Sequence, residues 1–236
     1  MAGPVGHIVC ALALINSTNL EIDDKNAFFA GSVFPDIRYV AKNIERSTTH
    51  HMPNNSIEFV LDQKNSFKMG HYLHIWLDKE REEYMKKHKA YELLETKKYR
   101  TQVLKIIEDS LLFDQLQNKI NSHEIFNKIY EEEFSYNITT TELETWNKIQ
   151  TNYLDTKYNS NFFRHVTTAF IFFNSITTHK TPDSFFNKCK KNIKALMFFM
   201  YAYYKVQKFS SNKELKNIIF NFYNKHLPLV FSNSNK

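Results

Sequence analysis

Two histidines and an aspartate lie at helical spacing in the segment from Lys68 to Asp78. Because an α-helix advances about 100° per residue, His71, His74 and Asp78 would share an arc of about 60° on one face. Burying two imidazoles and a carboxylate among apolar residues costs free energy unless they have partners. A divalent ion such as Zn²⁺ would provide one, since His and Asp are common ligands of such metals. A half-exposed helix whose histidines bind neighbouring side chains explains the segment equally well.

Three further residues of metal-ligand type occur earlier in the chain, each beside a helix start or a turn. His7 opens an apolar segment, Asp36 follows a proline, and His50 ends the stretch Arg-Ser-Thr-Thr-His. His74 and Asp78 are spaced i, i+4, so both can reach the same ion from one helix. An HxxxD pair alone is a weak signal. The ordered set of donors predicts a metal site more firmly than any member does.

The elements that must position these residues are predicted to be helices. Hydrophobic residues make up 42% of the chain, but four Gly and five Pro are too few for the turns of a β-sandwich or barrel. We expect one all-α domain over residues 1–236, with the metal-site motifs in 1–90 and helical packing in 91–236. Helices are expected at 7–15, from Asp23 or Asp24 to Gly31, from Ser56 or Ser66 past Lys87, and at 90–117, 122–134, 139–158, 161–178, 182–208 and 211–225.

Local signals mark some of the boundaries. The spans Thr139–Glu142 and Ser211–Glu214 each fit the capping box that begins a helix. Pro35 is expected to force the residue before it out of helical geometry, which would make 31–36 a turn. The polar segment 46–55 is expected to be a loop. All glycines fall within the first 70 residues, near the candidate ligands, so constrained backbone geometry is expected there.

Four motifs then resemble, in order, those of a known family. They are Gly6-His7, Gly-Ser-Val-Phe-Pro-Asp at 31–36, Arg-x-x-Thr-His at 46–50, and Gly-His-Tyr-Leu-His-x-x-x-Asp at 70–78. Together they resemble the bacterial zinc-dependent phospholipase C family, whose fold is related to that of the fungal single-strand nucleases. The resemblance covers about the first third of the chain. It implies a compact multi-helix bundle of this type in which the metal ligands are His7, Asp36, His50, His74 and Asp78.

The chain departs from the family pattern after Asp78. Trinuclear members have a further His soon after the HxxxD pair and an HxxxE or HxxxD pair downstream. Here the next histidine is His88, the later His165 lacks an acidic residue at i+4, and a proline interrupts the span His179–Asp183. The N-terminal Trp that ligates metal in secreted members is also absent. We therefore expect one or two ions, Zn²⁺ with Mn or Fe as alternatives.

The resemblance implies a metal-dependent hydrolase of a phosphoester, either a diester or a monoester, with phospholipid as one candidate substrate. Asp36 would ligate metal or accept a proton from water, and Arg46 or His71 would stabilise the phosphate. Alternatively, Arg46 supports the His50 loop and His71 is a further ligand. No Walker A, GxGxxG or GxSxG motif points to another cofactor or nucleophile.

Two other classes of function fit the same residues. One is a non-catalytic helical interaction protein in which the metal is a structural clip that contributes to folding. The other is a single-strand nuclease, which predicts salt-sensitive binding to nucleic acid. We rank the nuclease below the lipid or small phosphoester hydrolase. The reason is that the sequence shows no cluster of aromatic and Arg residues on which nucleic-acid bases could stack.

The net charge of +6 is unevenly distributed. From Lys180 to Lys236, eleven Lys face only Asp183 and Glu214, which gives this segment +9. Evenly scattered Lys without Arg favours a solvated helix surface over a site for nucleic acid or lipid.

The sequence also bears on the cellular compartment. The apolar run from Ile8 to Ile15 is too short to span a membrane and no convincing cleavage site follows it. The two cysteines, Cys10 and Cys189, do not form a disulfide framework and suit a reducing compartment. We expect a cytoplasmic protein, with secretion by a route that needs no cleavable signal as the alternative.

Overall fold

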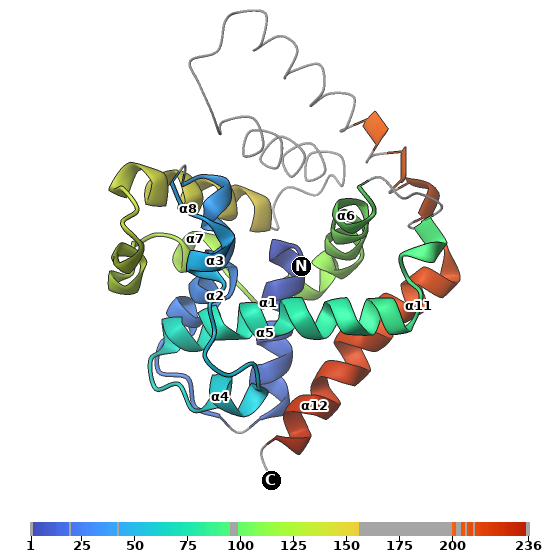
Figure 1. The fold of residues 1–236 in the computed structure, drawn as a ribbon, viewed down its shortest axis with the longest axis horizontal. Helices are drawn as coiled ribbons and strands as arrows, with labels where there is room; N and C mark the ends of the chain where they lie inside the picture. Colours follow the sequence, from blue (N-terminus) through green and yellow to red (C-terminus); the bar gives the residue numbers. More distant parts are fainter. Residues whose placement is uncertain are drawn as a thin grey trace, which may run out of the picture.

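The computed structural model describes residues 2–18, 20–41, 43–94, 99–155, 200–201, 204–205, 207–209 and 211–234. These residues form helices and turns, with no strand among them, and the prediction of an all-α protein is confirmed. Figure 1 shows the long helix α5 (Ser66–Lys87) crossing the molecule, with the other helices packed on both of its sides. The predicted helix over 161–178 and most of the one over 182–208 lie outside the described residues.

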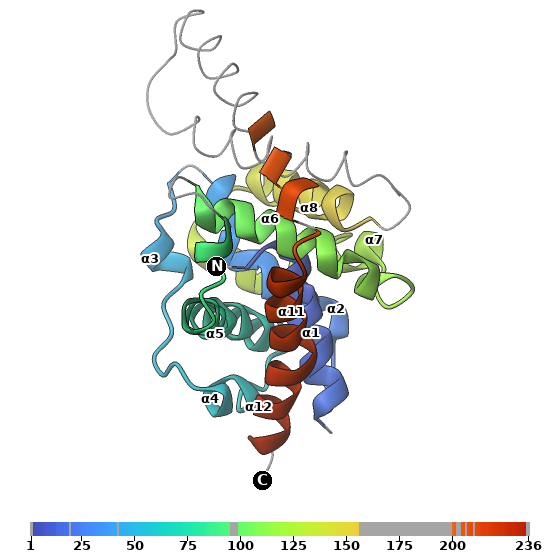
Figure 2. The ribbon, with the colours of Figure 1, turned by 90° about the vertical axis from the view of Figure 1, so that its right-hand side faces the viewer.

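The N-terminal helix α1 (Pro4–Ser17) runs through the middle of the fold. It begins earlier than the expected residue 7, because Pro4 occupies the first turn, where a missing N–H costs nothing. Val5, Ile8 and Leu14 are fully buried. The C-terminal helices α11 (Lys213–Asn221) and α12 (Leu227–Asn233) are joined by a π-helical turn, η5 (Phe222–His226). Figure 2 shows α12 beside α1, which contacts both α12 and η5.

The second helix follows the predicted start signal. In α2 (Lys25–Val33) the Asp24 carboxylate accepts a hydrogen bond of 2.9 Å from the amide of Ala27, so Asp24 is the N-cap. The expected turn over 31–36 is wrong. Phe34 is helical at φ −58° and ψ −40°, and a 3₁₀ helix, η1 (Phe34–Tyr39), continues directly from α2. A proline in the first turn of a helix is tolerated, and this outweighs its bias against helical geometry in the preceding residue.

The segment before the central helix contains more helix than expected. The predicted loop over 46–55 begins instead with one helical turn, α3 (Arg46–Thr49), and only its remainder is irregular. Ser56 and Ser66, the two alternative starts predicted for the central helix, mark the beginnings of two separate helices. Ser56 caps the short α4 (Ile57–Leu61), and Asn65, whose side chain accepts from the amide of Lys68, caps α5.

The described residues between 90 and 136 form shorter pieces than expected. The predicted helices 90–117 and 122–134 are each broken, giving η2 (Glu92–Leu94), α6 (Arg100–Leu112), η3 (Phe113–Leu116), α7 (Ser122–Ile125) and η4 (Glu131–Tyr136). The capping box at Thr139–Glu142 is confirmed at the start of α8 (Thr140–Leu154). The second expected box is wrong, since Asn212 rather than Ser211 caps α11.

Helices α2 and α5 pack with their backbones in close contact. Gly31 lies against the backbone of Phe67, and Gly70 lies against the backbone of Phe28. Glycine at both positions permits this approach, since any Cβ would overlap a main-chain atom of the other helix. The crossing brings the C-terminal end of α2 against the start of the third turn of α5, where the candidate ligand His74 is located.

No helix among the described residues is both long and apolar enough to cross a membrane.

Candidate metal centre

The five predicted ligands come from four separate elements and meet in the interior. His7 is in α1, Asp36 in η1, His50 at the end of α3, and His74 and Asp78 in α5. Among the described residues there are two groups of three residues whose ligand atoms lie within 4.8 Å of one another inside each group. His74 belongs to both groups. One group is His7, His74 and Asp78, and the other is Asp36, His50 and His74. The structure therefore brings together all five residues that the sequence singles out as ligands.

The carboxylate of Asp78 lies between the histidines. Its Oδ1 is 3.6 Å from Nε2 of His7, while its Oδ2 is 3.7 Å from Nε2 of His50 and 3.8 Å from Nε2 of His74. These separations are too long for hydrogen bonds. Ligand atoms at about 2.0–2.1 Å from one tetrahedral Zn²⁺ would lie roughly 3.4 Å apart, which is close to the observed spacing.

The orientation of His74 follows from the end of α2. Its Nδ1 is 2.9 Å from the carbonyl oxygen of Ser32, which belongs to the last turn of α2. A carbonyl only accepts, so Nδ1 carries the proton and Nε2 carries the lone pair. That Nε2 is buried and has no hydrogen-bond partner among the described residues. This arrangement is typical of a metal-binding histidine, whose second nitrogen donates to a carbonyl.

A hydroxyl fixes His50 in the same way. The Thr49 hydroxyl donates to the carbonyl oxygen of Pro35 at 2.8 Å, so its oxygen is left to accept from Nδ1 of His50 at 3.0 Å. Nε2 of His50 then carries the lone pair. It too is buried, and no residue in the described part of the chain forms a hydrogen bond with it. The unprotonated Nε2 atoms of His50 and His74, which come from distant segments, therefore lie close together in the interior.

Within the described ranges, His7 has no hydrogen bond at either ring nitrogen, although the side chain is buried. Its ring stacks on that of His74, with centroids 3.7 Å apart and planes inclined by 6°. An unpartnered buried imidazole costs free energy of about 1–3 kcal/mol. Three such Nε2 atoms around two carboxylates fit a divalent cation of the Zn²⁺, Mn²⁺ or Fe²⁺ kind.

The protonation states suit this role. Burial lowers the pKa of His7 and of His50 to about 3, and it holds the pKa of His74 well below its usual value. Burial alone would raise the pKa of Asp36, but Lys105, His74 and Arg38 hold it well below its usual range. At neutral pH the site therefore has neutral imidazoles and ionised carboxylates, the forms that bind metal.

Two cations beside Asp36 were not predicted from the sequence. Lys105 in α6 places Nζ 3.2 Å from Oδ2 of Asp36, and Arg38 places Nη2 3.4 Å from Oδ1. The available signal for Lys105 was its position in the apolar run Val103-Leu104-Lys105-Ile106-Ile107 of a helix. A lysine in such a run is more often solvated than buried, so its sequence context alone does not reveal the contact.

The two remaining candidates, Arg46 and His71, differ in their relation to the site. Arg46 lies at the site, with Nη2 2.9 Å from Oδ2 of Asp78 and 44% of its side chain exposed. His71 is not among the converging donors. Its Nε2 bonds to the carbonyl oxygen of Thr49 at 2.8 Å, and its ring stacks on Tyr136. His71 therefore supports the residue next to His50.

Comparisons of this chain with models of known protein families, with curated proteins and with solved structures found no match. The geometry of the site is thus the basis for the functional proposal.

Proposed function

We propose that this chain is a metal-dependent phosphoester hydrolase with a fold of the phospholipase C and single-strand nuclease type. The observation that carries the proposal is the convergence of three bare imidazole nitrogens and two carboxylates in one buried volume. Three cationic side chains, Arg38, Arg46 and Lys105, bind those carboxylates. Metal ligands surrounded by fixed positive charge suit an anionic substrate such as a phosphoester.

In this proposal the ligands are His7, Asp36, His50, His74 and Asp78, and the ion is Zn²⁺, with Mn²⁺ or Fe²⁺ as alternatives. The two oxygens of Asp78 face different histidines, which accommodates either one ion or two ions that share this carboxylate. When bound, such an ion supplies Lewis acidity that polarises a phosphoryl oxygen and activates water for attack on phosphorus.

The remaining roles follow from exposure and contacts. Arg46 is the most exposed of the three cations, so it contacts a substrate phosphate first while holding Asp78 in position. Asp36 stays ionised between two cations, which makes it a ligand rather than a carrier of protons. His71 is a positioning residue for the segment that holds His50. The substrate class is a phosphodiester or phosphomonoester, with phospholipid among the candidates and nucleic acid ranked below it.

The test combines metal analysis with turnover. We expect the purified protein to contain about one or two equivalents of Zn, Mn or Fe and to hydrolyse p-nitrophenyl phosphate or bis-p-nitrophenyl phosphate. His74→Ala should lose both metal and turnover. His51→Ala is the matched control, since this exposed neighbour of His50 belongs to neither donor group and should change neither property.

Two results would contradict the proposed function. A protein without stoichiometric metal, or one in which His74→Ala leaves turnover unchanged, would overturn it. A structural metal clip would give a different pattern, in which chelation unfolds the protein and the metal-loaded form hydrolyses no phosphoester. A chelated protein that keeps its circular dichroism but loses turnover supports the enzyme.

A further inference from the structure

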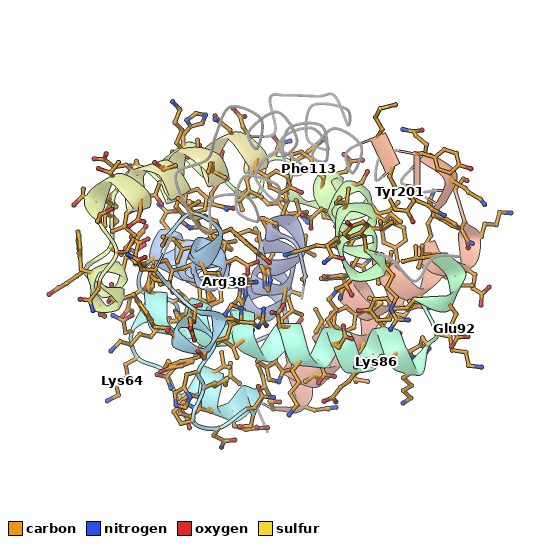
Figure 3. All side chains as sticks on the ribbon, turned by 45° about the horizontal axis from the view of Figure 1, so that its top comes forward. Arg38, Lys64, Lys86, Glu92, Phe113 and Tyr201 are labelled. Atoms are coloured by element: carbon orange, nitrogen blue, oxygen red, sulfur yellow. The ribbon has the colours of Figure 1, made fainter. Side chains whose placement is uncertain are left out.

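Asp109 in α6 is a buried residue whose carboxylate lies at the start of α1. It is 4% exposed, its Oδ1 accepts a hydrogen bond of 3.1 Å from the amide of Gly6, and its Oδ2 accepts one of 2.6 Å from the Tyr153 hydroxyl. The carboxylate also lies directly against Gly3, where a Cβ would be 2.1 Å from Oδ2. Figure 3 shows α6, in green, beside α1, in blue. Asp109 therefore joins α6 to the first turn of α1 and to α8.

The contact with Gly6 replaces a cap that α1 itself lacks. Gly3 is the N-cap of α1 and has no side chain that could accept a hydrogen bond, so the amide of Gly6, at the third helical position, needs another acceptor. Asp109 provides this acceptor from a different helix. A carboxylate is well suited to the place, because the start of a helix has a partial positive charge. The position of the first turn of α1 is therefore set by α6.

The direction of His7 depends on this first turn. The other two histidines of the site each have a hydrogen bond at Nδ1 that fixes the ring. In the described part of the chain His7 has no such bond, and its ring stacks on that of His74. Its Nε2, which is 3.6 Å from Oδ1 of Asp78, is therefore directed by the backbone of α1 immediately after Gly6.

Further contacts link α6 and the start of the chain to the site. The amide of Ala2, a fully buried residue, donates to Oδ1 of Asp78 at 2.9 Å. One turn before Asp109 in α6, Lys105 places Nζ 3.2 Å from Oδ2 of Asp36. Burial raises the pKa of Asp109 to about 6, and its hydrogen bonds and the charge of Lys105 oppose this rise. Helix α6 thus supports both sides of the metal centre.

We propose that Asp109 is a positioning residue of the metal centre, which caps α1 from α6 and thereby holds His7 in the position from which it binds metal. This role rests on the proposed function, because it presupposes the ion. Among the described residues, Asp109 belongs to neither group of converging donors, so it acts through the segment 2–7. Without its carboxylate, the amide of Gly6 loses a buried acceptor and the first turn of α1 loses its attachment to α6.

The test is metal affinity at pH 8, where Asp109 is ionised, measured by competition with a chromogenic chelator. Asp109→Ala removes the acceptor for Gly6 and should weaken metal binding about 10–100-fold, the usual effect of losing a residue that orients a ligand. Asp109→Asn keeps an acceptor oxygen and should bind metal nearly as tightly as the wild type. Asp114→Ala removes an exposed acidic residue just after α6 and should have no effect.

Two comparisons separate positioning from a general loss of stability. Ile107→Ala removes a fully buried side chain from another side of α6, so it should lower the midpoint of urea unfolding while metal affinity stays close to that of the wild type. In protein that already carries His7→Ala, Asp109→Ala should weaken metal binding much less, because the residue through which it acts is gone. If Asp109→Ala does not fold, Gly3→Ala tests the same contact, since its methyl group must displace the carboxylate.

The inference fails on either of two results. One is an Asp109→Ala protein, or a Gly3→Ala protein where the first does not fold, that binds metal as tightly as the wild type. The other is a loss of affinity that Ile107→Ala reproduces or that is equally large in the presence of His7→Ala, which would assign Asp109 a purely structural role. In both cases the proposed hydrolase stands if metal and turnover depend on His74. A wild-type protein that binds no metal would overturn the proposed function and this role together.

Discussion

Gly31 in α2 and Gly70 in α5 each lie against the backbone of the opposite helix where the two cross. A Cβ on Gly31 would be 2.1 Å from the carbonyl oxygen of Phe67, and one on Gly70 would be 2.0 Å from that of Phe28. Only hydrogen fits at such distances. The pair therefore sets the separation of the two helices, and with it the position of His74 against the end of α2.

Replacing Gly70 with alanine should destabilise the fold, although alanine is the better helix former. Helix propensity favours the change by about 1 kcal/mol. The overlap with a main-chain oxygen outweighs this gain, because overpacking against a backbone costs about 1–3 kcal/mol or more. We expect a lower midpoint in urea unfolding and weaker metal binding. Lys79→Ala, at an exposed position of the same helix, should change stability by less than about 0.5 kcal/mol. An unchanged midpoint in Gly70→Ala would contradict the close crossing.

Local patterns were enough to predict much of the fold and the identity of the donors that converge. The i, i+4 spacing of His74 and Asp78 places both on one face of α5, and the caps at Asp24 and Thr139 depend on neighbours in sequence. Where local rules conflicted with tertiary packing, the predictions failed. The bias that Pro35 imposes on its predecessor was too weak to end the helical path after α2.

The surroundings of the donors could not be predicted, because they depend on which helix ends meet. The carbonyl of Ser32 orients His74 across 42 residues of sequence, and Lys105 reaches Asp36 across 69. Neither contact has a sequence motif. The family-like motifs were therefore sufficient to find candidate ligands, while the cations that distinguish the site required the packed structure.

The Thr49 hydroxyl should control metal affinity without being a ligand. Thr49→Val keeps the shape of the side chain but removes the acceptor that fixes the His50 ring, together with the bond to the carbonyl of Pro35. Loss of such a partner typically weakens metal binding about 10–100-fold. Competition with a chromogenic chelator would measure this. Thr48→Val is the control, since Thr48 is exposed. Equal affinities in the two variants would show that the hydroxyl does not orient His50.

The chelated protein should lose stability on mild acidification. Burial lowers the pKa of His7 and His50 to about 3 and that of His71 to about 4, and it holds that of His74 well below 6.5. The unfolded chain has ordinary histidines with pKa near 6.5. Between these values the unfolded state binds more protons, so the free energy of unfolding falls as the pH drops from about 6.5 towards 4.

Buried carboxyls whose pKa is raised, among them Asp109 and Glu133, act in the opposite direction in part of this range. Burial raises the pKa of Asp109 to about 6 and that of Glu133 to about 7, so the folded state takes up their protons first. The four histidines still dominate, leaving a net uptake on unfolding of roughly two protons at pH 5.5, or about 3 kcal/mol per pH unit. Urea unfolding at pH 7, 6 and 5 with chelator measures the slope. His71→Gln should reduce it by about one proton, and a flat profile would contradict the burial of neutral histidines.

The ion pair between Arg81 and Glu108 should stabilise the fold only as a pair. Both side chains are fully buried, and Nε of Arg81 donates to the two carboxylate oxygens at 2.9 and 2.8 Å, while Nη1 donates to the Tyr91 hydroxyl at 3.2 Å. Removing one partner leaves an uncompensated charge in the core. Arg81→Met and Glu108→Leu should therefore each cost about 3–5 kcal/mol, whereas replacing both residues with apolar ones can be nearly neutral.

A double-mutant cycle measured by urea unfolding tests this directly. We expect Arg81→Met combined with Glu108→Leu to recover most of the stability that either single change removes. Metal content should stay at the wild-type level in the double variant, because neither residue belongs to the converging donors in the described part of the chain. Additive losses would show instead that the two residues stabilise the fold independently. A loss of metal in the stable double variant would show that α5 and α6 transmit the packing of this pair to Asp78 and its neighbours.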